Sequence, residues 1–155
     1  MFTRGFPALF LKCLIVFCLL SFLRDGFCAE ISSLKVSLVS NLNFGMAPQG
    51  DPSKTVQPST SETPDNASFE VGGAPNSAYT ISLPKSHVVM STHSAYAGSR
   101  TILVTDFSSF PPEGANGVTG PDGLQMLFVG ATRAPLAFNQ APGSYSGVFV
   151  VTVIY

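Results

Sequence analysis

Short extended segments separated by clusters of turn formers fill the chain from about residue 34 to residue 155. Because Pro fixes φ while Gly and Asn tolerate positive φ, the clusters at 48–52, 72–76, 110–117 and 141–143 predict turns and loops. No stretch of useful length shows helical apolar periodicity. The pattern predicts an all-β sandwich of seven to nine short antiparallel strands. Its clearest strands are expected at 34–38, 68–71, 77–83, 87–90, 101–105, 124–129 and 146–155.

The first 29 residues have the pattern of a signal peptide. Arg4 and Lys12 precede an apolar run of eleven residues, 13–23. Spanning the hydrocarbon core of a bilayer takes about 20 residues, so the run is too short for that but fits the apolar region of a signal peptide. Small residues at Gly26 and Ala29 place the cleavage near residue 29. A retained membrane anchor is the alternative if the apolar residues before Lys12 are counted.

This pattern predicts a signal peptide at 1–29, one domain at 30–155, and secretion to the periplasm, the cell surface or the medium. All three cysteines, Cys13, Cys18 and Cys28, lie inside the predicted signal peptide, so the mature chain has no thiol and its core folds without a disulfide. From residue 30 onward, five Lys and Arg stand against eight Asp and Glu, which gives a formal charge of −3. Without a basic surface, nucleic acid is not an expected partner.

Two segments of the predicted domain differ from the rest. Residues 51–66 are polar and are expected to form a loop that carries one edge strand at 54–57. The last predicted strand is apolar at both parities over 148–154. A strand with two apolar faces needs cover on both sides and usually a neighbour at each edge, so an incomplete sandwich edge is expected here.

Three pieces in a fixed order carry a family resemblance: Leu42-Asn43-Phe44-Gly45, then Tyr79-Thr80-Ile81-Ser82-Leu83-Pro84, then 139–147 leading into the closing 151–155. Over residues 33–155 the sequence resembles the bacterial domain-of-unknown-function family DUF4402. That family is similar to spore coat protein U-like subunits and other chaperone-usher pilins. The resemblance implies an immunoglobulin-like, pilin-like sandwich that acts as a structural or accessory subunit of a surface filament or coat.

The same resemblance implies assembly by β-strand addition, with the chain itself or related subunits as partners and a periplasmic chaperone and usher as helpers. Subunits of this kind carry an N-terminal donor extension, whereas cleavage near Ala29 leaves only residues 30–32 before the first strand. Either the extension is missing, or residues 31–39 serve as donor, or the cut falls earlier. The candidate partner-strand residues are Leu34, Val36, Leu38, Phe149, Val151, Val153 and Tyr155.

Sites for catalysis or metal binding are not expected. His87 and His93 are the only histidines, and a zinc or copper site needs three or four ligands. The string 143–147 has Tyr where a nucleophile elbow needs Ser, and 114–120 lacks the Lys-Ser/Thr of a phosphate-binding loop. Glu70 and Asp106 are the only strand-associated acids, so we expect no catalytic residue, cofactor or metal.

Two other functional classes stay open. A self-complete secreted monomer would bind a glycan or a protein through loops such as 108–123. A hydrolase would need a triad of His87 or His93 with an acid such as Asp106. Most aromatic residues are expected in the core, with Phe110 as the exposed ring. The expected core aromatics are Phe44, Phe69, Tyr79, Phe107, Phe128, Phe138, Tyr145, Phe149 and Tyr155.

Overall fold

The computed structural model describes residues 33–155, so the predicted signal peptide at 1–29, its cysteines and Ile31 lie outside the described residues. The described chain contains nine strands and no helix, and therefore no helix long and apolar enough to cross a membrane. The strands are β1 (Lys35–Ser40), β2 (Lys54–Val56), β3 (Ala67–Gly72), β4 (Ala78–Ser82), β5 (Val88–Ser91), β6 (Thr101–Phe110), β7 (Gly114–Val118), β8 (Leu124–Arg133) and β9 (Thr152–Ile154).

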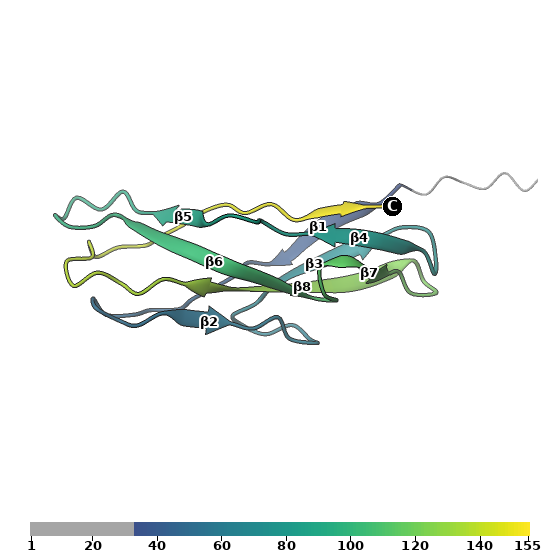
Figure 1. The fold of residues 1–155 in the computed structure, drawn as a ribbon, viewed down its shortest axis with the longest axis horizontal. Coiled ribbons are helices and arrows are strands. Elements are labelled where there is room, and N and C mark those ends of the chain that lie inside the picture. The colour runs from purple at the N-terminus through teal and green to yellow at the C-terminus, as the bar shows by residue number, and fades with distance from the viewer. Residues whose placement is uncertain (1–32) are drawn as a thin grey trace, which may run out of the picture. The chain divides into compact units, whose positions relative to one another are not determined.

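The strands form two antiparallel sheets that pack as a sandwich, which confirms the predicted fold class (Figure 1). One sheet has the order β1-β3-β8-β6-β5, with β2 paired to the far part of β8. The other sheet has the order β7-β4-β9. The two longest strands, β6 and β8, lie side by side in the larger sheet and join its two halves.

The strand order matches that of an immunoglobulin sandwich with one strand fewer. With β1, β3, β4, β6, β8 and β9 named A to F in chain order, the larger sheet contains A-B-E-D and the smaller sheet pairs C with F. An immunoglobulin domain places strand G beside F, on the edge that C does not occupy. Within residues 33–155 no strand takes that place, so this edge of β9 is open.

The core lies between the sheets in two clusters. One gathers around Val71, Ile81, Leu127 and Val129, which are almost completely buried, and the other lies around Phe44, Val56, Val104 and Ala131. Strand β4 shows why the sequence folds this way, because its side chains alternate between the buried Tyr79 and Ile81 and more exposed neighbours.

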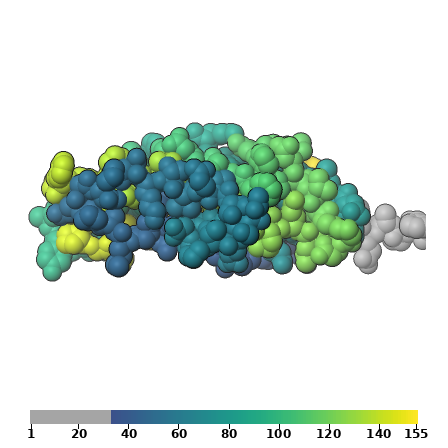
Figure 2. Space-filling view, turned by 90° about the horizontal axis from the view of Figure 1, so that it is seen from below, coloured from purple at the N-terminus to yellow at the C-terminus, as the bar shows by residue number. Residues whose placement is uncertain are grey.

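Strand β8 is buried on both faces over 127–131, because the chain that leaves the end of β2, residues 56–58, crosses its outer face at Gly130. A Cβ on Gly130 would lie 2.2 Å from the carbonyl oxygen of Val56, so only glycine permits this close approach. The prediction of an edge strand within the polar segment 51–66 is confirmed by β2, and Figure 2 shows this part of the chain, in blue, at the surface of the molecule. Asn66 of this segment is fully buried and donates from Nδ2 to the Ser61 carbonyl.

Two strand predictions were wrong. The C-terminal strand was expected over 146–155, but only Thr152–Ile154 pairs with β4, and Ser146 forms a lone bridge to Ser91. The second error is β7, which was predicted to be a turn because it is rich in glycine. A Cβ on Gly117 would lie 2.3 Å from the Tyr79 ring, so this strand needs a residue without a side chain to pair with β4. Because β7 occupies 114–118, much of 108–123 is strand rather than binding loop.

The buried Tyr79 predicts a loss of stability at alkaline pH. Burial raises the pKa of its hydroxyl, which donates to Gln125 Oε1, to about 12. The unfolded chain ionises near its ordinary pKa of about 10, so stability present below pH 10 falls as the pH rises toward 12. Between pH 9 and pH 11 the free energy of unfolding should fall by about 1 kcal/mol more than it does in Tyr79→Phe. Urea unfolding of both proteins measures this, and parallel pH profiles would contradict it.

Candidate functional site

The candidate site is the open edge between β1 and the C-terminal segment, by which we mean residues 145–155. A Cβ on Gly73 would meet both the Tyr155 hydroxyl and the Leu34 side chain, so the start of β1 and the end of the chain come together there. At the other end, Asn41 and Leu42 line the same cavity as residues 145–147 and Phe149. The two segments therefore run in opposite directions along the two sides of one groove, which we call the edge groove.

The edge groove has an apolar floor. Its cavity measures about 310 Å³ and is lined between its two sides by Phe44, Val88, Met90, Val104 and Phe107. Within residues 33–155, β1 pairs only with β3, and the backbone of 147–151 belongs to no strand. The groove thus combines an apolar floor with two strand edges that retain free main-chain hydrogen-bonding capacity.

Val36 and Leu38 lie on the inner face of β1 but are not covered. Val36 stands opposite the fully buried Val71, and Leu38 stands opposite Phe69, which packs on the core. Opposed residues of an antiparallel pair share a face, so both side chains point toward the inside of the sandwich. They are nevertheless 41% and 57% exposed, which leaves inner-face apolar positions without a packing partner.

The C-terminal segment alternates between packed and exposed side chains. Phe149, Val151 and Val153 pack against the core, whereas Val148 and Val150 are 85% and 67% exposed. Phe149 meets Phe69 edge-on at 6.2 Å between ring centroids and lies 5.3 Å from Phe107. The prediction that this segment is apolar on both faces describes it well, but only one of those faces is covered by residues 33–155.

The structure distributes the seven candidate partner-strand residues in three ways. Leu34, Phe149, Val151 and Val153 pack partly against the core, and Val36 and Leu38 lie beside it half exposed. Tyr155 was expected in the core, but it is exposed and its hydroxyl accepts a hydrogen bond from the Ala74 amide.

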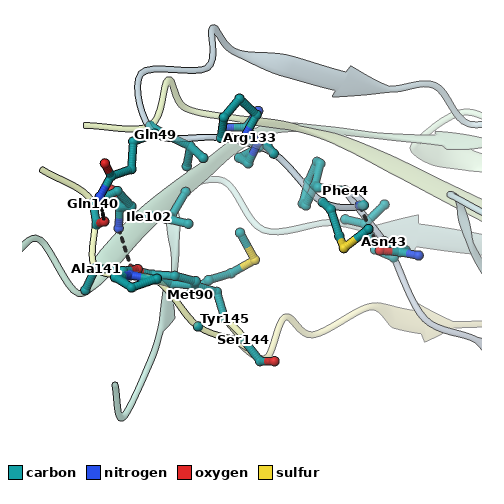
Figure 3. A pocket seen from close by; sticks show the side chains of 18 residues that line it. Asn43, Phe44, Gln49, Met90, Ile102, Arg133, Gln140, Ala141, Ser144 and Tyr145 are labelled. Atoms are coloured by element: carbon teal, nitrogen blue, oxygen red, sulfur yellow. Dashed lines mark hydrogen bonds between the residues drawn. The ribbon is translucent and has the colours of Figure 1, made fainter. Parts of the chain in front are cut away.

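The edge groove continues into a larger cavity with a polar side, here called the polar cavity. It measures about 720 Å³ and shares Leu42, Phe44, Met90 and Tyr145 with the groove. Figure 3 shows Gln49 and Arg133 on one side, Met90 and Tyr145 opposite, and Phe44 and Asn43 at the far end. Sequence reasoning did not identify this cavity.

Hydrogen bonds of Gln140 and Tyr145 hold the wall of the polar cavity. Gln140 donates from Nε2 to the Ser99 carbonyl and the Tyr145 hydroxyl, and that hydroxyl donates to the Ala141 carbonyl. Gly98 has a positive φ, and a Cβ there would lie 2.1 Å from the Asn139 carbonyl oxygen. The turn before the C-terminal segment is therefore fixed to the loop between β5 and β6. Both Gln140 and Tyr145 lie in the motif 139–147, so this motif is the sequence feature that could have indicated the wall of the cavity.

Residues with catalytic potential are scattered. In the part of the chain that the structure describes, no three His, Cys, Asp or Glu side chains come close enough to hold a metal ion. The glycine-rich stretch at 114–120 consists of β7 and the residues after it. Beside it, the Lys85 ammonium lowers the pKa of Glu113 by a hydrogen bond between their side chains.

The aromatic residues follow the prediction except at the surface. Phe44, Tyr79 and Phe128 are buried as expected. Phe110 is exposed, also as expected, but Phe138 was wrongly assigned to the core and is 89% exposed. Its ring lies against Gly50, where a Cβ would come within 2.6 Å of it.

Replacing Phe149 with Ala tests the packed face of the C-terminal segment. The ring is partly buried and contacts two other aromatic rings, so we expect the free energy of unfolding to fall by about 2–3 kcal/mol, somewhat less than for a fully buried Phe. Denaturant unfolding measures the loss. A value below about 1 kcal/mol would mean that the ring contributes little to its own domain.

Comparison with known proteins gives one match. A family described as "Domain of unknown function (DUF4402)" matches residues 34–155, which includes every described strand. No curated protein and no solved structure matches the chain.

Proposed function

The chain belongs to the DUF4402 family of domains of unknown function, and from this we propose that it is an exported structural or accessory subunit of a bacterial surface filament or coat. In this proposal the subunit assembles by β-strand addition, in which an extended segment from another polypeptide enters the edge groove. The observation that carries the proposal is the open groove between β1 and the C-terminal segment, with Val36 and Leu38 uncovered on the inner face of β1.

Strand addition fits the groove for two physical reasons. An exposed strand edge carries free N–H and C=O groups that pair with another extended chain. Alternate side chains of the incoming segment then fill apolar positions. Phe149 lines the cavity, and Val36 and Leu38 are left uncovered on the neighbouring β1. The absence of a strand G among residues 33–155, together with the resemblance to pilin-like subunits, supports the same mechanism.

Pairing of β1 with β3 bears on the donor question. Five register pairs hold β1 in its own domain, interrupted by a bulge before Ser40. For residues 31–39 to act as donor, β1 of the donating copy would have to leave its own β3 and pair in a neighbour's edge groove. We propose that the occupant is this segment of another copy, or the corresponding segment of a related subunit, and that a periplasmic chaperone and an usher deliver it.

Assembly is tested with residues 30–155 secreted into the periplasm and purified. We expect a ladder of oligomers on an unboiled denaturing gel that collapses to one band on boiling. A capped peptide that copies residues 31–40 should enter the groove and raise the melting temperature of the smallest species. A monomer that neither forms a ladder nor responds to the peptide would contradict the proposal.

Export is tested separately. N-terminal sequencing of protein recovered from the periplasm or the medium should begin between residues 27 and 31, because the small residues there fit a signal peptidase site. Full-length protein found only in the cytosol would contradict export.

A further inference from the structure

Three residues close one end of the edge groove: Leu34, Gly73 and Tyr155, here called the closed end. A Cβ on Gly73 would lie 2.5 Å from the Tyr155 hydroxyl oxygen and 3.0 Å from Leu34 Cδ2, so both side chains reach the same point. Leu34 packs partly against the core just before β1, and Tyr155 directly follows β9. The two sides of the groove therefore meet at this end.

Hydrogen bonds of the turn after β3 fix the closed end. The Ala74 amide donates to the Tyr155 hydroxyl at 2.8 Å. The Ala74 carbonyl accepts from Oγ1 of the buried Thr119. The Gly73 amide donates to the carbonyl of Gly123, the residue before β8. The Tyr155 hydroxyl is thus held by a turn that is itself bonded to the residues between β7 and β8.

An inserted strand needs more room than the closed end leaves. A strand lies about 4.8 Å from each of its neighbours in a sheet, so the two flanks must stand about 10 Å apart. The inward side chains of the inserted strand also need space between those flanks. At the closed end the side chains of Leu34 and Tyr155 already fill that space. A segment with bulky side chains therefore has to end before this point.

The opposite end of the groove is open. There the edge groove continues into the polar cavity of about 720 Å³, with which it shares Leu42, Phe44, Met90 and Tyr145. About nine residues, 34–42, separate the closed end from this cavity. A longer inserted segment has room for its additional residues only on the side of the polar cavity.

We infer that Tyr155 sets the register of the inserted segment, by blocking the groove at the closed end. The groove then accepts an extended segment that ends level with Leu34, and it tolerates additional residues only at the other end. A fixed end decides which side chains reach the apolar floor, since a shift by one residue turns them to the opposite face. The inference rests on the proposed function, because it states which partner segments fit the groove.

The test uses the capped peptide that copies residues 31–40 and two longer forms, with Leu-Leu added at one end or the other. On the unaltered protein, the addition should be tolerated at one end and should weaken binding at least about tenfold at the other. At the blocked end the peptide must shift by two residues, which leaves an apolar position of the groove empty. Fluorescence anisotropy measures the affinities.

The position of the blocked end is tested by NMR. A nitroxide is placed on an outward-facing residue of the 31–40 peptide, at the end that does not tolerate the addition. It should broaden the signal of the Ala74 amide, which donates to Tyr155. The same label at the opposite end should leave that signal sharp.

Two variants should remove the difference between the two ends. Tyr155→Ala takes away the ring, and the exposed position of Tyr155 means that the fold should survive the change. Gly73→Ala places a Cβ against the Tyr155 hydroxyl, so the flexible side chain must move away. In both variants the two longer peptides should bind within about threefold of each other. Gly72→Ala is the matched control, because its Cβ would make only an ordinary contact, 3.5 Å from Leu124 Cδ2, and the difference should remain.

Equal tolerance of the addition at both ends of the peptide, on the unaltered protein, would overturn this inference and leave the proposed function standing. A difference that persists in Tyr155→Ala would also overturn it. If that variant fails to fold, Gly73→Ala and the nitroxide experiment decide. Failure of the 31–40 peptide itself to bind would overturn the proposed function as well.

Discussion

Replacing Val36 and Leu38 together with Asp should lower the affinity for the 31–40 peptide by at least about a hundredfold. Both side chains are half exposed in the free chain, so the partner's apolar side chains would cover them only on binding. The two substitutions remove that burial and add two charges that must lose water. Fluorescence anisotropy with labelled peptide measures the loss, and the oligomer ladder should vanish in parallel.

The matched control is the pair Val148 and Val150, also replaced with Asp. These side chains are more exposed than the β1 pair and lie on the outer face, away from the core. The added charge is the same, but the peptide affinity should change less than about threefold. Equal losses in the two proteins would indicate a general charge effect and contradict the groove. Thermal melts distinguish loss of binding from loss of fold. Backbone pairing with β3 should keep β1 in place, so the Val36 and Leu38 variant should still unfold cooperatively.

Replacing Leu127 with Ala should lower the free energy of unfolding by about 3–5 kcal/mol. Leu127 is completely buried in the centre of β8, opposite Phe69 and within the larger core cluster. Truncation removes buried methyl groups and leaves a cavity that paired strands on both sides keep from collapsing. Residues 33–155 contain no cysteine, so no disulfide within them limits the loss.

Leu124→Ala is the control on the same strand. Leu124 is exposed at the start of β8, so its truncation should cost less than about 1 kcal/mol. Urea unfolding of both variants, with and without reductant, measures the difference. If Leu127→Ala costs no more than Leu124→Ala, the centre of β8 is not the centre of the core.

The strands that could be predicted from the sequence are those with a local apolar pattern, either alternating apolar residues or an apolar run. Alternation in β4 and the apolar run of β8 located both strands, because burial against the opposite sheet follows directly from side-chain parity. The glycines of β7 gave no such signal, since the need for them comes from the Tyr79 ring on the neighbouring strand. A contact with a residue on a neighbouring strand, such as the Tyr79 ring, cannot be recognised from the residues of β7 alone.

The site was predicted in part for a similar reason. An apolar segment at both parities indicated an edge that needs cover, and residues 145–155 do lie at an open edge. The pattern does not show which residues lie across from that segment, nor where its pairing stops. Arg133 was beyond prediction, because a cation at the end of an apolar strand looks like a surface charge unless the position of Asp51 is known.

The cover over β8 also sets an order of events along the chain. Segment 51–66 precedes β8 in sequence. When the chain appears from its N-terminus onward, as in synthesis, this segment is therefore present before the strand that it covers. The apolar run 127–131 would otherwise be a hazard for intermolecular pairing while the fold is incomplete. Residues 145–155 follow β8 in sequence and keep one face that residues 33–155 do not cover. The apolar surface that stays open is therefore formed after β8 is covered, and it is confined to one edge of the sandwich.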